Sequence, residues 1–342
     1  MSEKMDEALE LLSRYGPEYH GGLANHAPMV ADALIAMGRA GSVINWLESY
    51  SRNLESRAGT AQRISTHDWR EALSEFGRYP DWVAFFQEQF KERSWKDVLA
   101  IWVENLAPGL AAAAAHGLLR TAHIVRRLEE KETELRLKEL AEGLAYWASR
   151  YQTLPVSASV PASKGQPNQV ISLVPFLDAT MRAGGFITDR LEKLNSFEPF
   201  APAIHLIDDS GDVQATLSNL TQVFTRIYLM NPRRSLIAFV HAVTGPGSLR
   251  MLLPYLSPGV KRAALRYAWQ LAAAIYSTNA EVLYSKETGL QITQQDDLVD
   301  RALDSGDEHA IKFTEVCLRE YKINPDPVYL IAARHASSQL RR

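Results

Sequence analysis

Helical periodicity is the feature that most constrains the fold of this 342-residue chain. Apolar residues recur three and four positions apart along most of its length, which is the spacing of one face of an α-helix. No segment alternates apolar and polar residues over a useful length, and neither a strand–helix–strand rhythm nor a fixed repeat of about 30–45 residues is present. Only short runs such as Ile204–Ile207 could form strands. We therefore predict an all-α fold of many, largely antiparallel helices packed around a buried cavity lined by histidines.

Start and stop signals set the expected helix boundaries. Asn25 is predicted to cap a helix over 26–37, and Asp307 a helix over 307–321. In the first half we expect helices at 9–15, 26–37, 42–54, 67–76 (with Thr66 as its cap), 81–93, 95–106, from Pro108 to about Lys131, and 134–151. In the second half we expect them at 170–182, 185–195, 212–230, 235–243, 259–284, 296–304, 307–321 and 326–340.

A proline-rich segment interrupts the helices at 152–169. It holds three prolines and many Ser, Gln and Ala residues, a composition typical of a loop or linker. We interpret the chain as a single all-helical domain over 1–342, in which this loop joins two helical halves, 1–151 and 170–342.

Composition narrows the class of protein. Hydrophobic content of 46% with a net charge of −3 excludes global disorder, and it gives no electrostatic case for a nucleic-acid partner. The single cysteine, Cys317, cannot form an internal disulfide, which fits a reducing compartment. The start of the sequence lacks the pattern of a secretory signal, and the most apolar stretch, Leu106–Leu119, is interrupted by Pro108, Gly109 and His116. A cytoplasmic protein without a membrane partner is expected; the sequence leaves its oligomeric state open.

The common catalytic and nucleotide-binding motifs are missing from the sequence. It contains no G-x-G-x-x-G, P-loop, H-E-x-x-H, G-x-S-x-G or C-x-x-C pattern. Gly184-Gly185 and the run from Thr244 to Gly247 are predicted to be turns rather than phosphate loops. The placement of the nine histidines therefore carries most of the remaining information.

His116 and His123 lie seven residues apart in a predicted helix. That spacing leaves two side chains ~20° apart around the helix axis and roughly 10.5 Å apart along it. Two imidazoles so placed could converge on one ion, or one could pack in the core while the other is exposed.

The other histidines have similar alternatives. His241 stands in an apolar run and needs a polar partner, which could be a metal, a substrate or a backbone carbonyl. His26 follows the predicted cap Asn25, where a surface histidine is also common. Lys312 lies one turn after His309 on one helix face, and the ordinary interpretation is a solvated or ion-paired lysine.

Five segments that carry these histidines or lie near them resemble the questin oxidase-like family. They are 22–29, 116–123, 143–151, 239–244 and 306–312, and the resemblance extends over about 20–325. It implies oxidative ring cleavage of an aromatic polyketide-like substrate, by Baeyer–Villiger-type oxygen insertion or by direct dioxygenation. Dioxygen and the aromatic small molecule would then be the partners, with NADPH required by some members.

The metal-dependent branch of that family implies a non-haem iron site. The site would be built from several histidines and a carboxylated lysine. Carried over to this chain, the resemblance implies the ligands His26, His116, His123, His241 and His309, with Lys312 as the modified lysine.

This chemistry is coherent with the residue types. Imidazole nitrogens suit Fe(II), whereas the ammonium form of Lys312 has no lone pair and cannot bind a metal. Addition of carbon dioxide gives an anionic carbamate, provided that the lysine pKa is low enough for the neutral amine to exist. Arg120 could steady an anionic substrate or peroxide, or it could be an ordinary ion-paired arginine. Asp307 and Glu308 could orient His309, or could serve only the helix dipole.

Two other function classes remain open on sequence grounds. The same histidines could hold zinc in a hydrolase or lyase, or could fill the core of a non-enzymatic helical binding protein. The abundant aromatic residues could line a substrate pocket, although at helical spacing they more often form plain core; they include Trp46, Trp82, Phe85, Trp102, Tyr146 and Trp147.

Overall fold

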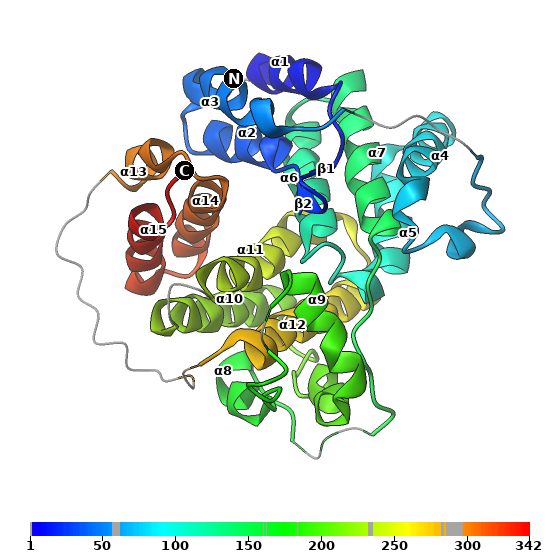
Figure 1. Ribbon diagram of the computed structural model, residues 1–342. Helices are drawn as coiled ribbons and strands as arrows, with labels where there is room; N and C mark the ends of the chain where they lie inside the picture. Colours follow the sequence, from blue (N-terminus) through cyan, green and yellow to red (C-terminus); the bar gives the residue numbers. More distant parts are fainter. Residues whose placement is uncertain are drawn as a thin grey trace. The chain divides into compact units, whose positions relative to one another are not determined.

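The computed structural model describes residues 2–56, 62–159, 161, 163–182, 184–231, 235–281, 284 and 297–342. The all-α prediction is confirmed, because helices dominate the chain in Figure 1. Within these ranges, the paired strands are β1 (Glu18–Tyr19) and β2 (Leu23–Ala24), a short antiparallel pair with Glu18 opposite Ala24.

The chain forms two compact units. Unit 1 comprises Met1–Gln152 and Met251–Leu256, and unit 2 comprises Thr153–Arg250 and Ser257–Arg342. The boundary after Gln152 falls at the start of the proline-rich segment.

Unit 1 is built around α6, which packs against α7 and α2, while α7 also packs against α4 (Figure 1). Its core is rich in aromatic rings, and Trp82 stacks on Phe86 within it. The helices of unit 1 are α1 (Ser2–Leu12), α2 (Ala27–Ala36), η1 (Ala40–Ser42), α3 (Val43–Tyr50), η2 (Ser51–Asn53), η3 (Trp69–Ala72), η4 (Phe76–Arg78), α4 (Tyr79–Glu92), α5 (Trp95–Leu106), η5 (Ala107–Gly109), α6 (His116–Glu130), α7 (Glu134–Ser149) and, with its last residues, η10 (Leu253–Tyr255).

The alanine run before His116 corrects the predicted helix over 108–131. After η5 the chain turns, and Ala113, Ala114 and Ala115 adopt left-handed backbone angles, with φ of 46°, 55° and 74°. Left-handed backbone costs an L-residue roughly 1–2 kcal/mol, so the intrinsic preference of alanine for helix is overridden here by tertiary packing. The helix α6 therefore begins at His116 and not at Pro108.

Other boundaries in unit 1 also differ. The predicted helix at 67–76 is replaced by the short η3 and η4, and Asp68 rather than Thr66 precedes η3. Asn25 does act at the start of α2, since its side-chain oxygen accepts a hydrogen bond from the Ala27 N–H at 3.0 Å.

Glycines at the contact of α6 and α7 allow the two backbones to touch. A Cβ on Gly117 would lie 2.5 Å from Trp147 Cα, closer than real Cβ contacts, and one on Gly143 would lie 3.0 Å from the Thr121 nitrogen. Because backbone atoms form the obstacle, no side-chain rotation can relieve the clash.

Gly117→Ala is therefore expected to lower the free energy of unfolding by about 1–3 kcal/mol, the usual cost of overpacking a core. Chemical denaturation of the purified protein measures this value. Gly41→Ala is the matched control, because nothing lies within 4 Å of a Cβ at that position. Equal stabilities of the two variants would contradict a tight α6–α7 contact.

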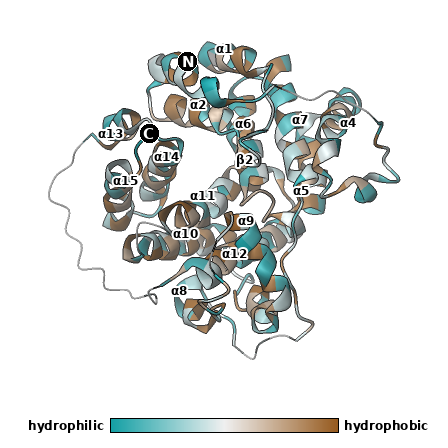
Figure 2. Ribbon diagram, in the orientation of Figure 1, coloured by the Kyte–Doolittle hydropathy of each residue, from teal (hydrophilic) through white to brown (hydrophobic). Residues whose placement is uncertain are grey.

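Unit 2 is a set of longer helices in which α15 packs against α14, α13 and α10. Hydrophobic residues run along α10 in Figure 2, and they are buried. The helices of unit 2 are α8 (Pro167–Val170), η6 (Ile171–Leu173), α9 (Ile187–Glu192), η7 (Lys193–Ser196), η8 (Glu198–His205), α10 (Val213–Met230), α11 (Leu236–Leu252), α12 (Pro258–Asn279), α13 (Leu298–Ser305), α14 (Glu308–Ile323) and α15 (Pro327–Gln339).

Three predictions for unit 2 need correction. The helix expected at 170–182 is limited to α8 and η6, and the segment from Val174 to Arg182 is irregular. The helix α11 continues through the run from Thr244 to Gly247 that was predicted to turn, with Pro246 inside it. The run Ile204–Ile207 is not a strand, since η8 reaches His205 and Ile207 forms only an isolated bridge with Gly165.

The described part of the segment 152–169 is held on unit 2 by hydrogen bonds. The Gly165 N–H donates to Leu206 O at 3.0 Å, and the Ser157 N–H donates to Ala201 O at 3.1 Å. The described residues of this segment therefore form no helix before Pro167, but hydrogen bonds anchor them to unit 2.

One described stretch, Leu236–Tyr255, is long and apolar enough to cross a bilayer by composition. However, 89% of its apolar window is buried inside the protein, which is typical of a core helix.

Candidate functional site

Unit 2 brings three predicted site residues together. His241 comes from α11, whereas His309 and Lys312 lie one turn apart on α14. The rings of His241 and His309 approach each other edge to face, with their centroids 5.4 Å apart. His241 and Lys312 are only 2% and 1% exposed, so the cluster is shielded from bulk water.

Burial keeps the two imidazoles uncharged. It lowers the pKa of His241 to about 4, with the positive charge of Lys312 adding to the effect. The pKa of His309 lies well below its ordinary value because of burial, followed by Lys312 and His241. His241 Nδ1 lies 2.6 Å from Ile237 O; because a carbonyl only accepts, this nitrogen carries the proton and the lone pair is on Nε2. Neutral imidazole is the form that binds metals.

Lys312 is buried, as predicted, and it has no ion-pair partner among the described residues. Burial lowers its pKa to about 8, although the carboxylates of Glu308 and Asp307 act in the opposite direction. The structural alternative, an ion pair with Glu315, is not formed: Glu315 instead accepts from Arg319 Nε at 3.1 Å. A minor fraction of neutral amine, roughly a tenth at pH 7, is therefore available.

Asp307 and Glu308 surround the start of α14. Asp307 is confirmed as the N-cap, because its carboxylate accepts from the backbone N–H groups of His309 and Ala310 at 2.8 and 3.0 Å. His309 Nδ1 lies 3.7 Å from Asp307 Oδ1 and 3.9 Å from Glu308 Oε1, beyond hydrogen-bond distance. Burial, followed by the charge of Asp307, raises the pKa of Glu308.

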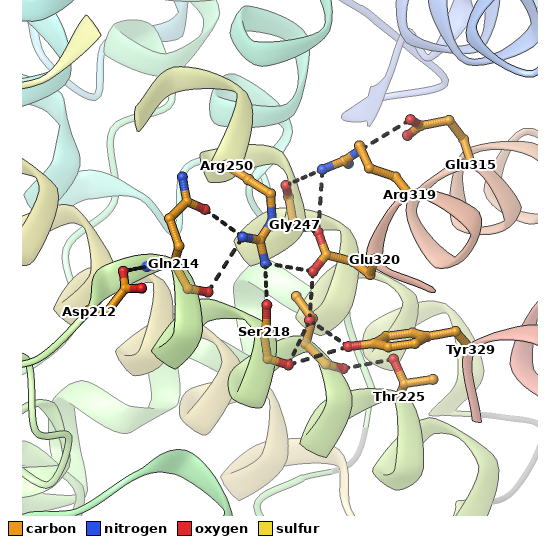
Figure 3. Close-up of polar contacts among 11 residues, drawn as sticks. Asp212, Gln214, Ser218, Thr225, Gly247, Arg250, Glu315, Arg319, Glu320 and Tyr329 are labelled. Atoms are coloured by element: carbon orange, nitrogen blue, oxygen red, sulfur yellow. Dashed lines mark hydrogen bonds and ion pairs between the residues drawn. The ribbon is translucent and has the colours of Figure 1, made fainter. Parts of the chain in front are cut away.

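A buried polar network fixes α11 against α14 (Figure 3). Arg250 donates two hydrogen bonds to Glu320, at 2.9 and 2.7 Å, and a third to Ser218 Oγ of α10 at 2.9 Å. Arg319 Nη1 donates to Gly247 O of α11 at 2.8 Å. A Cβ on Gly247 would lie 2.8 Å from Val316 Cγ1, so the two helices meet closely here. The same two helices carry His241, His309 and Lys312.

Unit 1 brings two further candidates together. The rings of His26 and His116 stack with centroids 4.6 Å apart and planes 25° apart. His116 Nδ1 lies 2.5 Å from Ala113 O in the left-handed alanine turn, which leaves its lone pair on Nε2. The turn that replaced the predicted helix thus orients this ring.

His123 lies in a charged cluster of unit 1. Its Nδ1 is 2.6 Å from Asp32 Oδ2, and Asp32 also contacts Arg126 and Arg127. Burial alone would raise the pKa of Asp32, but Arg126, followed by His123 and Arg127, holds it well below its usual range.

Arg120 forms the ion pair that the sequence left open. Its guanidinium donates two hydrogen bonds to Glu139, at 2.6 and 2.8 Å, and one to Glu142 at 2.6 Å. All three side chains are buried. Two carboxylates therefore balance its positive charge inside unit 1.

Comparison with models of known protein families supplies the assignment. Residues 23–317 match the family described as questin oxidase-like. The chain belongs to this family. Membership of the questin oxidase-like family indicates an oxidoreductase, and the matched range contains all seven predicted site residues. No curated protein matches the chain.

Within this questin oxidase-like protein, sequence analysis missed several buried charged groups. Asp32 is the sole charged residue of the apolar helix α2, a signal that was available in the sequence. Arg250 and Glu320 lie 70 positions apart, so nothing local in the sequence pairs them. The prediction that His116, His123 and His241 face one shared cavity stays a prediction, since it joins residues of the two separately described units.

Proposed function

We propose that the protein is a metal-dependent oxygenase, with Fe(II) as the metal, that cleaves or oxygenates an aromatic polyketide-like small molecule. The observation that carries the proposal is the pair of uncharged imidazoles, the buried His241 and the largely buried His309, beside the amine of Lys312, which has no ion-pair partner among the described residues. Family membership supplies the reaction class, oxidation.

The chemistry of this donor set fits the metal. Neutral imidazoles suit iron, and burial supplies them in that form at neutral pH. The neutral amine of Lys312 can attack carbon dioxide: an N–C bond forms, one proton is released, and an anionic carbamate oxygen results. Bound ferrous iron would supply the open coordination positions and the electrons needed to activate dioxygen.

Neighbouring residues fix the tautomer of His241 and the position of His309. Ile237 O holds the tautomer of His241, and Asp307 fixes the first turn of α14 on which His309 stands. The network of Arg250, Glu320 and Arg319 keeps α11 and α14 in register. The family resemblance also implies His26 and His116 as ligands, and within unit 1 these two rings stack on each other.

Metal analysis of anaerobically purified protein tests the proposal. We expect His241→Ala and His309→Ala to lower the iron content at least about tenfold, since each removes one donor, while circular dichroism shows an intact helical fold. His67→Ala, which alters an exposed histidine, is the control. His26→Ala, His116→Ala and His123→Ala, measured alongside, show which imidazoles of unit 1 matter. Equal iron content in all variants would contradict the proposal, and stoichiometric zinc would favour the hydrolase or lyase alternative.

The reaction type is tested with a hydroxyanthraquinone and isotopically labelled dioxygen. Dioxygenation places both labelled oxygen atoms in the product and needs no external reductant. Insertion of a single oxygen atom needs two further electrons, which NADPH would supply. Labelled product together with consumption of NADPH would therefore select the second route, and no dioxygen uptake at all would contradict both.

A further inference from the structure

A cavity of about 830 Å³ lies within unit 2, away from the residues discussed so far. Its described lining comes from the irregular segment before α9, from α9 itself, from Ser235 and from the end of α12. The volume is within the range of pockets that enclose small organic molecules, about 300–1,000 Å³.

Two arginines, Arg182 and Arg190, line this cavity without a carboxylate partner at ion-pair distance among the described residues. Arg182 donates to the backbone carbonyls of Leu177 and Ala280. Arg190 donates to the side chain of Asn279 and, at 3.4 Å, to Gly185 O. These hydrogen-bond partners are neutral, and the carboxylates of Asp178 and Asp189 act on Arg182 and Arg190 electrostatically without forming an ion pair among the described residues.

Arg190 has an additional unsatisfied donor. Its Nε is buried and has no hydrogen-bond partner in the part of the chain that the structure describes. Neighbouring Asp189 directs its carboxylate to the Phe186 N–H at the start of α9. The described acidic residue of the lining, Glu281, is exposed.

The contrast between these two partly exposed arginines and the buried arginines of the described chain is informative. Each of the buried arginines pairs with a carboxylate within 3 Å: Arg120 with Glu139, Arg127 with Asp32, Arg136 with Asp6 and Arg250 with Glu320. Arg182 and Arg190 lack such a partner among the described residues, and a guanidinium fork matches the two oxygens of a carboxylate or a phosphate. The arrangement of Arg182 and Arg190 is therefore suited to binding an anion.

An aromatic ring also lines the cavity. The Phe176 ring lines it, backed by Tyr276 with the ring centroids 4.9 Å apart, and the Arg182 guanidinium lies 5.6 Å from the Phe176 centroid. Ala179 and Ala280 are further apolar residues of the lining. A planar apolar body can pack against the ring while its charged end reaches the arginines.

We propose that this cavity binds an organic oxyanion, a carboxylate or a phosphate ester, that carries a flat apolar body. The oxyanion contacts Arg190 and Arg182, and the apolar body lies against Phe176. The site is independent of the proposed metal centre, so either proposal can fail without the other.

Isothermal titration calorimetry with three probes on the full-length protein tests this site. We expect 2-naphthoate or 2-naphthyl phosphate to bind at least about tenfold more tightly than neutral 2-naphthamide, because charge-assisted hydrogen bonds are the stronger ones. Tighter binding of 2-naphthoate would indicate a carboxylate ligand, and tighter binding of 2-naphthyl phosphate would indicate a phosphate ester. Absence of binding by both anions, or equal binding of the amide, overturns the proposal.

A pair of arginine variants locates the binding. Arg190→Gln removes the charge and the buried Nε donor, and we expect it to weaken binding of the tighter anion at least about tenfold. Arg262→Gln, at an exposed position on α12, is the matched control and is expected to bind like the unaltered protein. Arg190 is a better test than Arg182, whose hydrogen bonds fix two backbone carbonyls. Unchanged affinity in a folded Arg190→Gln variant would overturn the assignment.

Discussion

Glu320→Ala is expected to lower the free energy of unfolding by about 3–5 kcal/mol, the cost of breaking a buried ion pair by removing one partner. Glu320 is fully buried, and it accepts two hydrogen bonds from Arg250 and one from Thr221. Without its carboxylate, the guanidinium of Arg250 is left largely buried without a countercharge. Urea denaturation followed by circular dichroism measures the loss.

The stabilities of two further variants test whether the loss comes from the buried ion pair. Asp209→Ala disrupts an ion pair of unit 2 in which Arg266 is 43% exposed, and we expect it to cost at most about 1 kcal/mol. The double variant Arg250→Met with Glu320→Leu removes both charges together, and it is expected to recover most of the stability lost in Glu320→Ala. If Glu320→Ala costs no more than Asp209→Ala, the network does not hold α11 on α14.

The fold could be predicted largely from local pattern, because most helices of this chain begin and end with signals in their own residues. The boundaries of α10 and α14 agree with the sequence within two residues, helped by the capping carboxylates of Asp212 and Asp307. The failures occur where tertiary contacts override local preference. Alanine favours helix, yet Ala113–Ala115 form a left-handed turn.

The turn predicted from Thr244 to Gly247, within α11, was wrong for a related reason. A Gly-Pro-Gly sequence is a turn signal in isolation. Here Gly247 serves the close approach of Val316, and its carbonyl is held by Arg319, so the helix continues through Pro246. Both partners are far away in the sequence, and no local rule reports them.

The candidate site was predictable in its residues but not in its partners. A histidine in an apolar helix, such as His241, must find a polar neighbour, and sequence alone identifies that need. It does not reveal that His241 meets His309, that His116 is oriented by Ala113, or that Arg120 is neutralised by Glu139 and Glu142. These pairings depend on how the helices pack.

Lys312→Met is expected to stabilise the metal-free protein and to impair metal retention at the same time. The pKa of Lys312 falls from 10.5 to about 8 on folding, so burying its charged form costs about 3 kcal/mol near neutral pH. Methionine has a similar volume and no charge, and the variant avoids this cost. It also cannot form a carbamate, and we expect its iron content to fall at least about tenfold. Urea denaturation in chelator-treated, carbon-dioxide-free buffer gives the stability, and metal analysis gives the iron content.

The dependence on pH identifies the amine as the cause. A lysine whose pKa is lower in the folded state than in the unfolded state binds fewer protons when folded, so stability increases as the pH rises through that interval. Burial of Lys312 lowers the free energy of unfolding by its full amount below about pH 8, and it has no such effect above about pH 10.5. The advantage of Lys312→Met should therefore shrink by more than half between about pH 7 and about pH 9.5. Lys322→Met, at an exposed position of the same helix, should show neither the gain nor the pH dependence. A Lys312→Met variant that is no more stable than the unaltered protein at neutral pH would mean that the ammonium is compensated, and full iron content in that variant would exclude a carbamate ligand at Lys312.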